Sequence, residues 1–298
     1  TALIEQSEPK LEVRSILGTG GWGNVFEAWN TGLDRAVAVK VIHAEIISND
    51  PQAWQRFLRE AMILSRLTHK NIVRIYSFGR LVDSSPFITM ELLKGSLMSD
   101  QVRNSRLSLE VFKDVFMQTC DALKCLHDND VLHRDLKTSN IMLVKDERGH
   151  DLVKLMDFGL ALDHSIAGGD MQRLTSTGEV VGTVAYMSPE QCLGKPLDKR
   201  SDIYSLGCIL YESLMGQPPF VSDSSYSCMM MHAADDPPAL NYASEDRAAV
   251  EYVNRIIQRC LEKDPDDRYQ SAEELRDDLA SIFRARLTIS ASLPRAKS

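Results

Sequence analysis

Apolar residues alternate with polar ones through much of the first third of the chain, whereas in the remainder they recur every three or four residues. Alternation with a period of two is typical of strands, and the longer spacing is typical of amphipathic helices. Because the pattern changes once along the chain, we expect two unequal lobes. The first would contain strands and one helix, and the larger second lobe would be mainly helical.

Five strand-like runs occupy residues 11–17, 25–29, 35–42, 72–78 and 86–90. Turn residues at 30–32 join the second run to the third, which predicts an antiparallel meander. An N-cap and a first-turn proline at 49–51 then predict a helix. The apolar face of this helix would consist of Trp54, Phe57, Leu58, Ala61, Leu64 and Leu67. Residues 91–96 are predicted to be a connector into the helical lobe.

Helical patterns in the second lobe cover residues 108–126, 203–215, 250–261 and 271–283. Ser108 is the predicted N-cap of the first of these helices. The second helix is apolar nearly all round and stops at Gly216, as expected for a helix buried in the middle of a lobe. The last begins with Ser271 and Glu274, which have the spacing of a capping box.

Composition narrows the class of protein. A chain of 298 residues can bury an ample core without disulfides, and its six cysteines form no CxxC pair, so we expect reduced thiols in a cytosolic setting. The 42 acidic and 34 basic residues give a net charge of −8, which argues against a nucleic-acid-binding surface. No apolar run approaches the roughly 18 residues of a membrane span. The start at Thr1 suggests a fragment of a longer protein, and a membrane-anchored protein with this domain in the cytosol is one option.

The run GTGGWGNV places Gly18, Gly20 and Gly23 between two predicted strands. Small residues there would let backbone amides approach a polyanion closely, although three glycines in a hairpin are as often a simple turn. The spacing also matches the dinucleotide fingerprint, but that motif requires a helix after the loop, and here a strand follows.

Lys40 ends the run VAVK on the third predicted strand, beneath the glycine loop. A lone lysine on a strand is usually solvated. Apolar residues at 37, 39 and 41 occupy the face of the pleat opposite Lys40, so we expect both faces of this strand to make contacts. Glu60, within the apolar stretch of the following helix, is the predicted ion-pair partner of Lys40.

Two polar runs carry the remaining chemistry, HRDLKTSN at residues 133–140 and KLMDFG at 154–159. Asn140 and Asp157 offer oxygen ligands suited to Mg²⁺. Asp135 could accept a hydroxyl proton while Lys137 neutralises charge on a phosphoryl group in transfer. Either run alone could be a solvated charged turn, but the two together and in this order make that interpretation improbable.

With these motifs, the chain resembles the catalytic domain of a eukaryotic-like (bacterial-type) Ser/Thr protein kinase from about Leu11 to Phe283. The resemblance implies an α+β, bilobal fold, with the small lobe at 11–93 and the large lobe at 94–283. Residues 1–10 would be an N-terminal extension and 284–298 a basic tail or linker. Protein kinases are an established case of phosphoryl transfer, so the residue roles that follow are implied by the family.

The resemblance implies an ATP site in which the three glycines cover the phosphates, Lys40 holds the α- and β-phosphates, and Glu60 positions Lys40. Asp135 would be the catalytic base and Lys137 would contact the γ-phosphate. Asn140 and Asp157 would hold Mg²⁺, with Mn²⁺ as an alternative ion. The adenine site would comprise Val25, Ala38 and Met142, Met90 as gatekeeper, and the hinge from Glu91 to Leu93.

The run GTVAYMSPE at 182–190 resembles the substrate-docking end of the family's activation segment, with Ser188 in place of the usual alanine. By resemblance, Thr183 bonds the catalytic Asp and Lys. Glu190 would pair with Arg268. Asp202, in the run SDIYSLG, is expected to form hydrogen bonds with the backbone of the run HRDLKTSN at 133–140, which is called the catalytic loop below.

Arg134 resembles the family's phosphate receiver. A phosphate on Thr175 or Thr177 would add nearly two negative charges for its guanidinium group to bind, and we hypothesise that this orders the loop. A dimer of kinase domains would allow one copy to phosphorylate the other.

Two departures limit the resemblance. Thr138 stands where the family commonly has proline, which removes a backbone restriction but no catalytic group. The connector LLKGS is one small residue shorter than in many relatives, which leaves the ribose contact unassigned.

The predicted function is Mg²⁺- and ATP-dependent phosphorylation of Ser or Thr in protein substrates. One alternative is a pseudokinase, a binding module without phosphotransfer, but such proteins typically lack the lysine, the base or the metal-binding aspartate, and this chain keeps all of them. A second alternative is a small-molecule kinase of related fold. The docking run with Arg268 argues against it, because that platform serves protein substrates.

Overall fold

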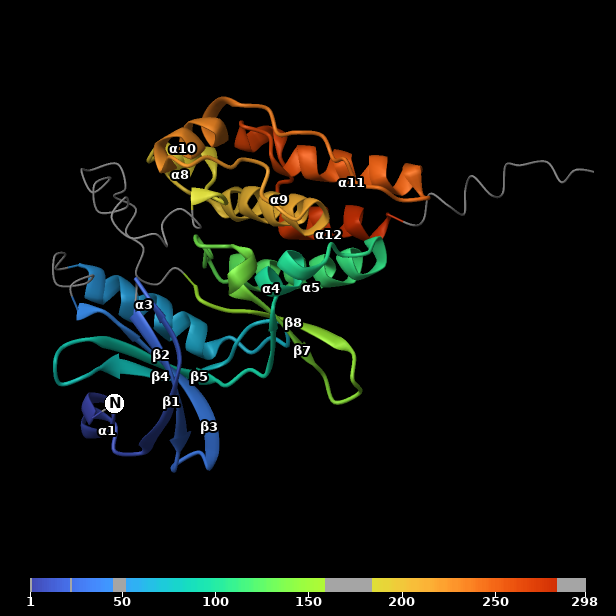
Figure 1. Ribbon diagram of the computed structural model, residues 1–298. Helices are drawn as coiled ribbons and strands as arrows, with labels where there is room; N and C mark the ends of the chain where they lie inside the picture. The colour runs from blue at the N-terminus through green and yellow to red at the C-terminus, as the bar shows by residue number, and fades with distance from the viewer. Residues whose placement is uncertain (1, 22, 45–51, 159–183, 283–298) are drawn as a thin grey trace, which may run out of the picture.

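The computed structural model describes residues 2–21, 23–44, 52–158 and 184–282. Figure 1 shows the strands and helix α3 gathered in one lobe and most of the helices stacked in the other. The predicted division into a small lobe with a sheet and a larger helical lobe is confirmed.

The small lobe is built on a five-stranded antiparallel sheet. Its strands are β1 (Leu11–Gly20), β2 (Gly23–Asn30), β3 (Arg35–Ile42), β4 (Ile75–Arg80) and β5 (Pro86–Glu91), in the order β1-β2-β3-β5-β4. Strand β3 has the predicted bounds. The run predicted to begin at Ile72 joins the sheet only from Ile75, because Ile72 instead forms an isolated bridge with Leu155 of the other lobe.

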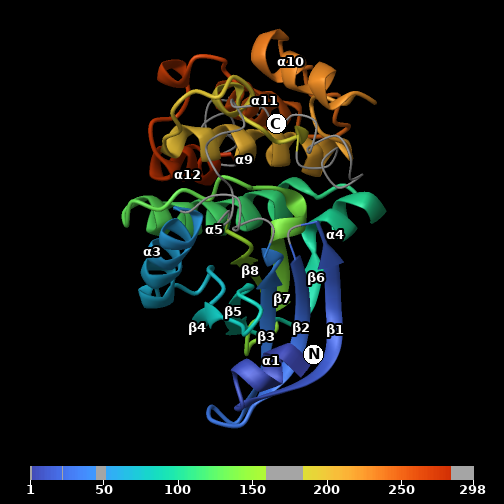
Figure 2. The ribbon, with the colours of Figure 1, turned by 90° about the vertical axis from the view of Figure 1, so that its left-hand side faces the viewer.

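Helix α3 (Ala53–Arg66) covers the inner face of this sheet and lies beside it in Figure 2. Phe57, Ala61 and Leu64 are buried, as their spacing predicts. The N-cap is Gln52, whose side chain makes no capping hydrogen bond. The cap predicted at 49–51 lies outside the described residues.

The outer face of the sheet is covered by a helix that the sequence did not indicate, α1 (Ala2–Ser7). Ile4 is 2% exposed and packs in an apolar cluster with residues of β1, β2, β3 and β5. Two polar contacts fix the helix, since the Glu5 carboxylate accepts from Val13 N at 3.0 Å and the Ser7 hydroxyl accepts from Val82 N at 2.9 Å. The sheet therefore has apolar packing on both faces.

The large lobe contains α4 (Met98–Asn104), α5 (Leu109–His127), α8 (Pro189–Cys192), α9 (Lys199–Met215), α10 (Ser225–Ala234), α11 (Arg247–Cys260) and α12 (Ala272–Ala280). It also contains two 3₁₀ turns, Thr138–Asn140 and Pro265–Asp267. A three-stranded sheet of β6 (Gly95–Leu97), β7 (Ile141–Lys145) and β8 (Asp151–Leu155) lies where the lobes meet (Figure 1). Strand β6 begins at Gly95, within the residues 91–96 that were predicted to be only a connector, and corrects that prediction.

Helix α9 is the centre of the large lobe. It is buried on all sides and ends at Gly216, whose φ of 81° is in the left-handed region that favours glycine. A Cβ atom at Gly207 would lie 2.6 Å from Cβ of Cys260, so this position allows α9 and α11 to pack closely. Ser108 caps α5 as predicted, accepting from Val111 N at 3.3 Å.

The capping box predicted for the last helix is half present. The Ser271 hydroxyl accepts from Glu274 N at 3.1 Å, but the Glu274 carboxylate accepts from Gln270 N instead of from its own N-cap residue. The same carboxylate pairs with Arg259 at 2.5 Å. Competition from a neighbouring cation and amide therefore changes the expected geometry.

One hydrophobic core runs through both lobes. It includes Ala38 and Ile88 of the sheet, Phe57 of α3, and Phe116 and Leu206 of the large lobe. The cluster around Ile4 on the outer face of the sheet is separate from it.

We expect Ile4→Ala to lower the free energy of unfolding by about 2 kcal/mol, the low end of the range for removing a buried aliphatic side chain, because α1 is short. Urea denaturation would measure the change. Leu3→Ala is the matched control, since Leu3 is 42% exposed on the same helix and should have an effect within about 0.5 kcal/mol. Equal effects for the two variants would show that the Ile4 contact does not stabilise the sheet.

Candidate active site

The backbone of the catalytic loop is hydrogen-bonded to the carboxylate of Asp202, which lies in the first turn of α9. Its oxygens accept hydrogen bonds from the backbone amides of His133 and Arg134, both at 2.9 Å, and Nε2 of His127 lies 2.8 Å away. Burial alone would raise the pKa of Asp202, but His127 and the other polar partners outweigh it, and the pKa lies below its ordinary value. The predicted contact between Asp202 and this backbone is present.

These hydrogen bonds hold a strained turn. Arg134 has a φ of 63°, which is uncommon for a residue with a side chain and costs about 1–3 kcal/mol. Asp157 has a φ of 56° and shares this property. Such backbone geometry persists only where surrounding contacts enforce it, and both residues lie where the motifs predicted chemistry.

The loop brings an acid, a cation and an amide together. Nζ of Lys137 lies 2.9 Å from Oδ2 of Asp135, and Nδ2 of Asn140 donates to the backbone oxygen of Asp135 at 2.7 Å. The 3₁₀ turn Thr138–Asn140 keeps these residues close together, and Asn140 N donates to the Lys137 carbonyl at 3.0 Å. Asp135, Lys137 and Asn140 therefore contact one another. By contrast, Nδ1 of His133 and Nε of Arg134 in the same loop are buried without a hydrogen-bond partner among the described residues.

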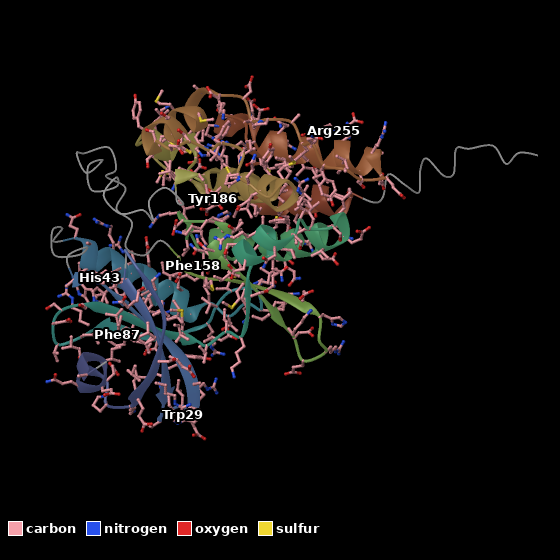
Figure 3. All side chains as sticks on the ribbon, viewed as in Figure 1. Trp29, His43, Phe87, Phe158, Tyr186 and Arg255 are labelled. Atoms are coloured by element: carbon pink, nitrogen blue, oxygen red, sulfur yellow. The ribbon has the colours of Figure 1, made fainter. Side chains whose placement is uncertain are left out.

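The segment after β8 lies against the catalytic loop. Met156 N donates to the Asn140 carbonyl at 3.0 Å, and the Met156 carbonyl is 3.1 Å from Nε2 of His133. His133 is fully buried and contacts the ring of Phe158, with 5.3 Å between ring centroids. Burial lowers the pKa of His133, so its imidazole is neutral at physiological pH. Phe158 lies at the junction of the lobes in Figure 3.

Lys40 and Glu60 each contact a partner other than the one predicted. Nζ of Lys40 pairs with Oδ1 of Asp157 at 2.9 Å, whereas Glu60 pairs with the guanidinium group of Arg134. All four side chains are partly buried, and two acids and two cations can be paired in two ways. Spacing along the chain cannot decide between the pairings, because the position of α3 against the catalytic loop decides it.

The glycine loop lies above β3. Gly18 and Gly20 are on β1, and Gly23 begins β2. A Cβ atom at Gly23 would overlap the backbone carbonyl oxygen of Val41, so only glycine permits this pairing of strands. The register places Gly20 opposite Gly23 at the turn.

The predicted adenine-binding residues come from both lobes. Val25 lies opposite Lys40 in the register, Ala38 lies opposite Met90, and Met142 lies on β7 of the large lobe. Met90 is 8% exposed, and Leu93 packs against the main core.

Glu91, at the start of the predicted hinge, makes a contact that sequence reasoning missed. Its carboxylate accepts from Nζ of Lys154 at 2.8 Å, which joins the hinge to β8. Lys154 lies three residues before Asp157. Its place in the alternation of this strand was the only feature of the sequence that could have indicated the contact with Glu91.

The described part of the docking segment begins at Val184. Ser188 caps α8 in a full capping box with Gln191, so the serine that departs from the family has a structural role. The same Gln191 donates from Nε2 to the carbonyl of Arg134 at 2.8 Å, and this contact with the catalytic loop was not predicted. Thr175, Thr177 and Thr183 lie outside the described residues.

Glu190 and Arg268 form a buried ion pair, with bonds of 2.8 and 3.0 Å. Ser201 also donates to Glu190 at 2.7 Å, and the guanidinium group donates to the carbonyls of Glu262, Lys263 and Arg200. Burial alone would raise the pKa of Glu190, but these partners outweigh it and the pKa lies below its ordinary value. The predicted pair is present, and it joins α8 to the segment before α12.

A bilobal fold with a glycine loop, a lysine on β3, a catalytic loop and a docking segment defines a protein kinase. The family model described as "Protein kinase domain" matches residues 11–279, and the chain belongs to this family. Among the described residues, no helix is both long and apolar enough to cross a membrane.

Similar proteins include "Serine/threonine-protein kinase PknB" of Mycobacterium leprae, 38% identical over 281 residues, which are 92% of this chain and 43% of the relative. "Probable serine/threonine-protein kinase SCO3848" of Streptomyces coelicolor is 38% identical over 278 residues, 92% of this chain and 40% of that protein. The chain thus spans less than half the length of these curated relatives. The PknI kinase domain of Mycobacterium tuberculosis has the same fold, with a TM-score of 0.72, 24% identity, and coverage of 92% of this chain and 96% of that one.

We expect the pair of Glu190 and Arg268 to make stability depend on pH. Because the pKa of Glu190 is lowered by folding, its contribution is present above the ordinary glutamate pKa and is lost as the pH falls through the folded value. Glu190→Gln should therefore destabilise the protein at neutral pH by about 3 kcal/mol and by less in acid. Urea unfolding at a series of pH values would measure this, with exposed Glu262→Gln as control. A pH-independent difference would contradict the assignment.

Proposed function

We propose that this domain transfers the γ-phosphoryl group of ATP to serine or threonine hydroxyls of protein substrates. The observation that carries the proposal is the convergence of Asp135, Lys137 and Asn140 within one loop, beside the ion pair of Lys40 and Asp157. These are the groups that phosphoryl transfer by a protein kinase requires. The names of the curated relatives support the same activity.

In the proposed reaction the substrate hydroxyl oxygen attacks the γ-phosphorus of ATP. Asp135 accepts the hydroxyl proton as the new oxygen–phosphorus bond forms and the bond to the β,γ-bridging oxygen breaks, which releases ADP. Lys137 is next to Asp135 and neutralises charge on the phosphoryl oxygens. Lys137 and Asn140 both contact Asp135, so they also hold it in one orientation.

The residues fit a magnesium ion that is bound together with the nucleotide. The amide nitrogen of Asn140 is used by Asp135, which leaves its oxygen as the ligand atom, and Asp157 adds a carboxylate. Among the described residues, no group of three or more His, Cys, Asp or Glu side chains could hold a metal. Two protein oxygens completed by phosphate oxygens and water suit Mg²⁺, with Mn²⁺ as an alternative. When bound, the ion neutralises phosphate charge and orients the γ-phosphate.

The pseudokinase alternative differs in one chemical respect, the absence of turnover. Lys40, Asp135, Asn140 and Asp157 are all present, which favours the enzyme. Lys137, together with Thr183 outside the described residues, favours Ser and Thr over Tyr as acceptor.

We also propose that phosphate on Thr175 or Thr177 activates the domain. In the structure, Arg134 is paired with Glu60, so a phosphate would compete with that carboxylate for the guanidinium group. Release of Glu60 would allow it to pair with Lys40 once Asp157 binds the metal. A second copy of the domain would be the simplest enzyme to transfer this phosphate from ATP.

Asp135→Asn should lower the rate of phosphotransfer by about 10²- to 10⁴-fold, because it removes a positioned base. The purified protein would be incubated with MgATP and a basic protein, and mass spectrometry would count phosphate on Ser and Thr. Asp223→Asn, an exposed substitution in the large lobe, is the control and should keep full activity. Unchanged turnover in the Asp135 variant would refute its role, and nucleotide binding without turnover in the unaltered protein would favour the pseudokinase.

Replacing both Thr175 and Thr177 by alanine should lower activity at least about tenfold. The lost phosphate would have formed a charge-assisted hydrogen bond with Arg134, worth about 1.5–3 kcal/mol. Rates before and after incubation with MgATP would be compared with those of a Ser165→Ala control. Full activity in the double variant would exclude activation at these threonines.

A further inference from the structure

Thr138 has a buried hydroxyl at a position where the resembled family commonly has proline. The residue is 2% exposed and opens the 3₁₀ turn that ends at Asn140. Proline would fix the backbone φ at this point, and threonine does not. A buried hydroxyl requires a partner, and Oγ1 of Thr138 lies 3.1 Å from the hydroxyl oxygen of Tyr186.

The direction of this hydrogen bond follows from proton counting. Tyr186 donates its single hydroxyl proton to Oε2 of Glu212 at 2.6 Å. Burial raises the pKa of Tyr186, so the phenol keeps that proton. Its oxygen can then only accept from Thr138. Tyr186 thus links Thr138 to Glu212, and the Thr138 hydroxyl also interacts directly with the Glu212 carboxylate.

This chain of hydrogen bonds joins three parts of the site. Thr138 belongs to the catalytic loop, Tyr186 to the docking segment, and Glu212 to the central helix α9. The backbone of Tyr186 is also fixed to α9, because Ser205 donates to its carbonyl at 2.7 Å. In the view of Figure 3, Tyr186 lies in the helical lobe above Phe158. The Thr138 hydroxyl thus connects the catalytic loop to a segment that α9 already holds.

We infer that Thr138 is a positioning residue whose hydroxyl keeps the substrate-docking segment in register with the catalytic loop. The inference rests on the proposed function for its kinetic meaning. In this inference the side-chain hydrogen bond restricts the conformation of the catalytic loop in place of proline, and it adds a direct link to Tyr186. Loss of the hydroxyl should therefore affect the placement of the protein substrate and leave nucleotide binding unchanged.

The test compares Thr138→Val, which keeps the shape and removes the hydroxyl, with Thr138→Ser, which keeps the hydroxyl. The valine variant should raise KM for a protein substrate about three- to tenfold, the range for loss of one hydrogen bond, with KM for ATP unchanged. The serine variant should stay within twofold of the unaltered protein, a threshold set by the same range. Because Tyr186→Phe removes the same chain, the double variant with Thr138→Val should be no worse than Tyr186→Phe alone.

Thr119→Val is the matched control. Thr119 is also fully buried, but its hydroxyl donates to Val115 within its own helix α5 at 2.9 Å, remote from the docking segment. A general loss of stability would appear in this variant too and would lower the active fraction without raising KM. A serine variant as impaired as the valine variant, or a valine variant with normal KM, would overturn the inference.

Amide hydrogen exchange of residues 184–188 gives a readout that needs no turnover. Exchange there should be faster in Thr138→Val than in Thr138→Ser, Thr119→Val or the unaltered protein. If the unaltered protein shows no phosphotransfer, the proposed function fails while this measurement still decides whether Thr138 holds the segment. Equal exchange in all four proteins would overturn the inference.

Discussion

The site depends on one buried carboxylate, that of Asp202. It lies in the first turn of α9, where the helix dipole favours negative charge, and its oxygens accept from two consecutive backbone amides of the catalytic loop. These contacts compensate for the strained backbone at Arg134. With that turn fixed, the positions of the residues that follow it are fixed too, including Asp135, Lys137 and Asn140. A polar loop can therefore lie close to an apolar core because the central helix supplies its acceptor.

The four charged groups that pair β3 and α3 with the catalytic loop and the segment after β8 obey a related constraint. A partly buried charge without a partner is costly, so every arrangement of Lys40, Glu60, Arg134 and Asp157 must leave each of them paired. The structure contains one of the two complete pairings. The other complete pairing would join Lys40 to Glu60 and Arg134 to Asp157. In the proposed activation, phosphate would pair with Arg134 and a metal ion with Asp157, so Lys40 and Glu60 could then pair without leaving any charge unpaired.

Sequence patterns predicted the elements that are long and periodic. Strand β3 and the end of α9 at Gly216 agree with the expected bounds, because each has a clear periodicity or stop signal. Helix α1 and strand β6 are six and three residues long, too short for a period to be visible, and their burial depends on distant partners. The sequence indicated the four charged residues Lys40, Glu60, Arg134 and Asp157, but spacing along the chain could not decide which acid pairs with which cation. The contact from Gln191 to Arg134 was missed because no spacing pattern signals it and it is not among the contacts that the resemblance implies.

The continuous core has a consequence for how the protein holds together. Side chains of the sheet, of α3 and of α9 belong to one apolar cluster, so the change from strands to helices near residue 93 does not divide the core. A chain divided there would present to water the faces that the two halves bury on each other. The cluster around Ile4 is different, since it stabilises the sheet from outside and contributes nothing to the junction. Loosening of the outer layer can therefore precede global unfolding without disturbing the core that joins the lobes.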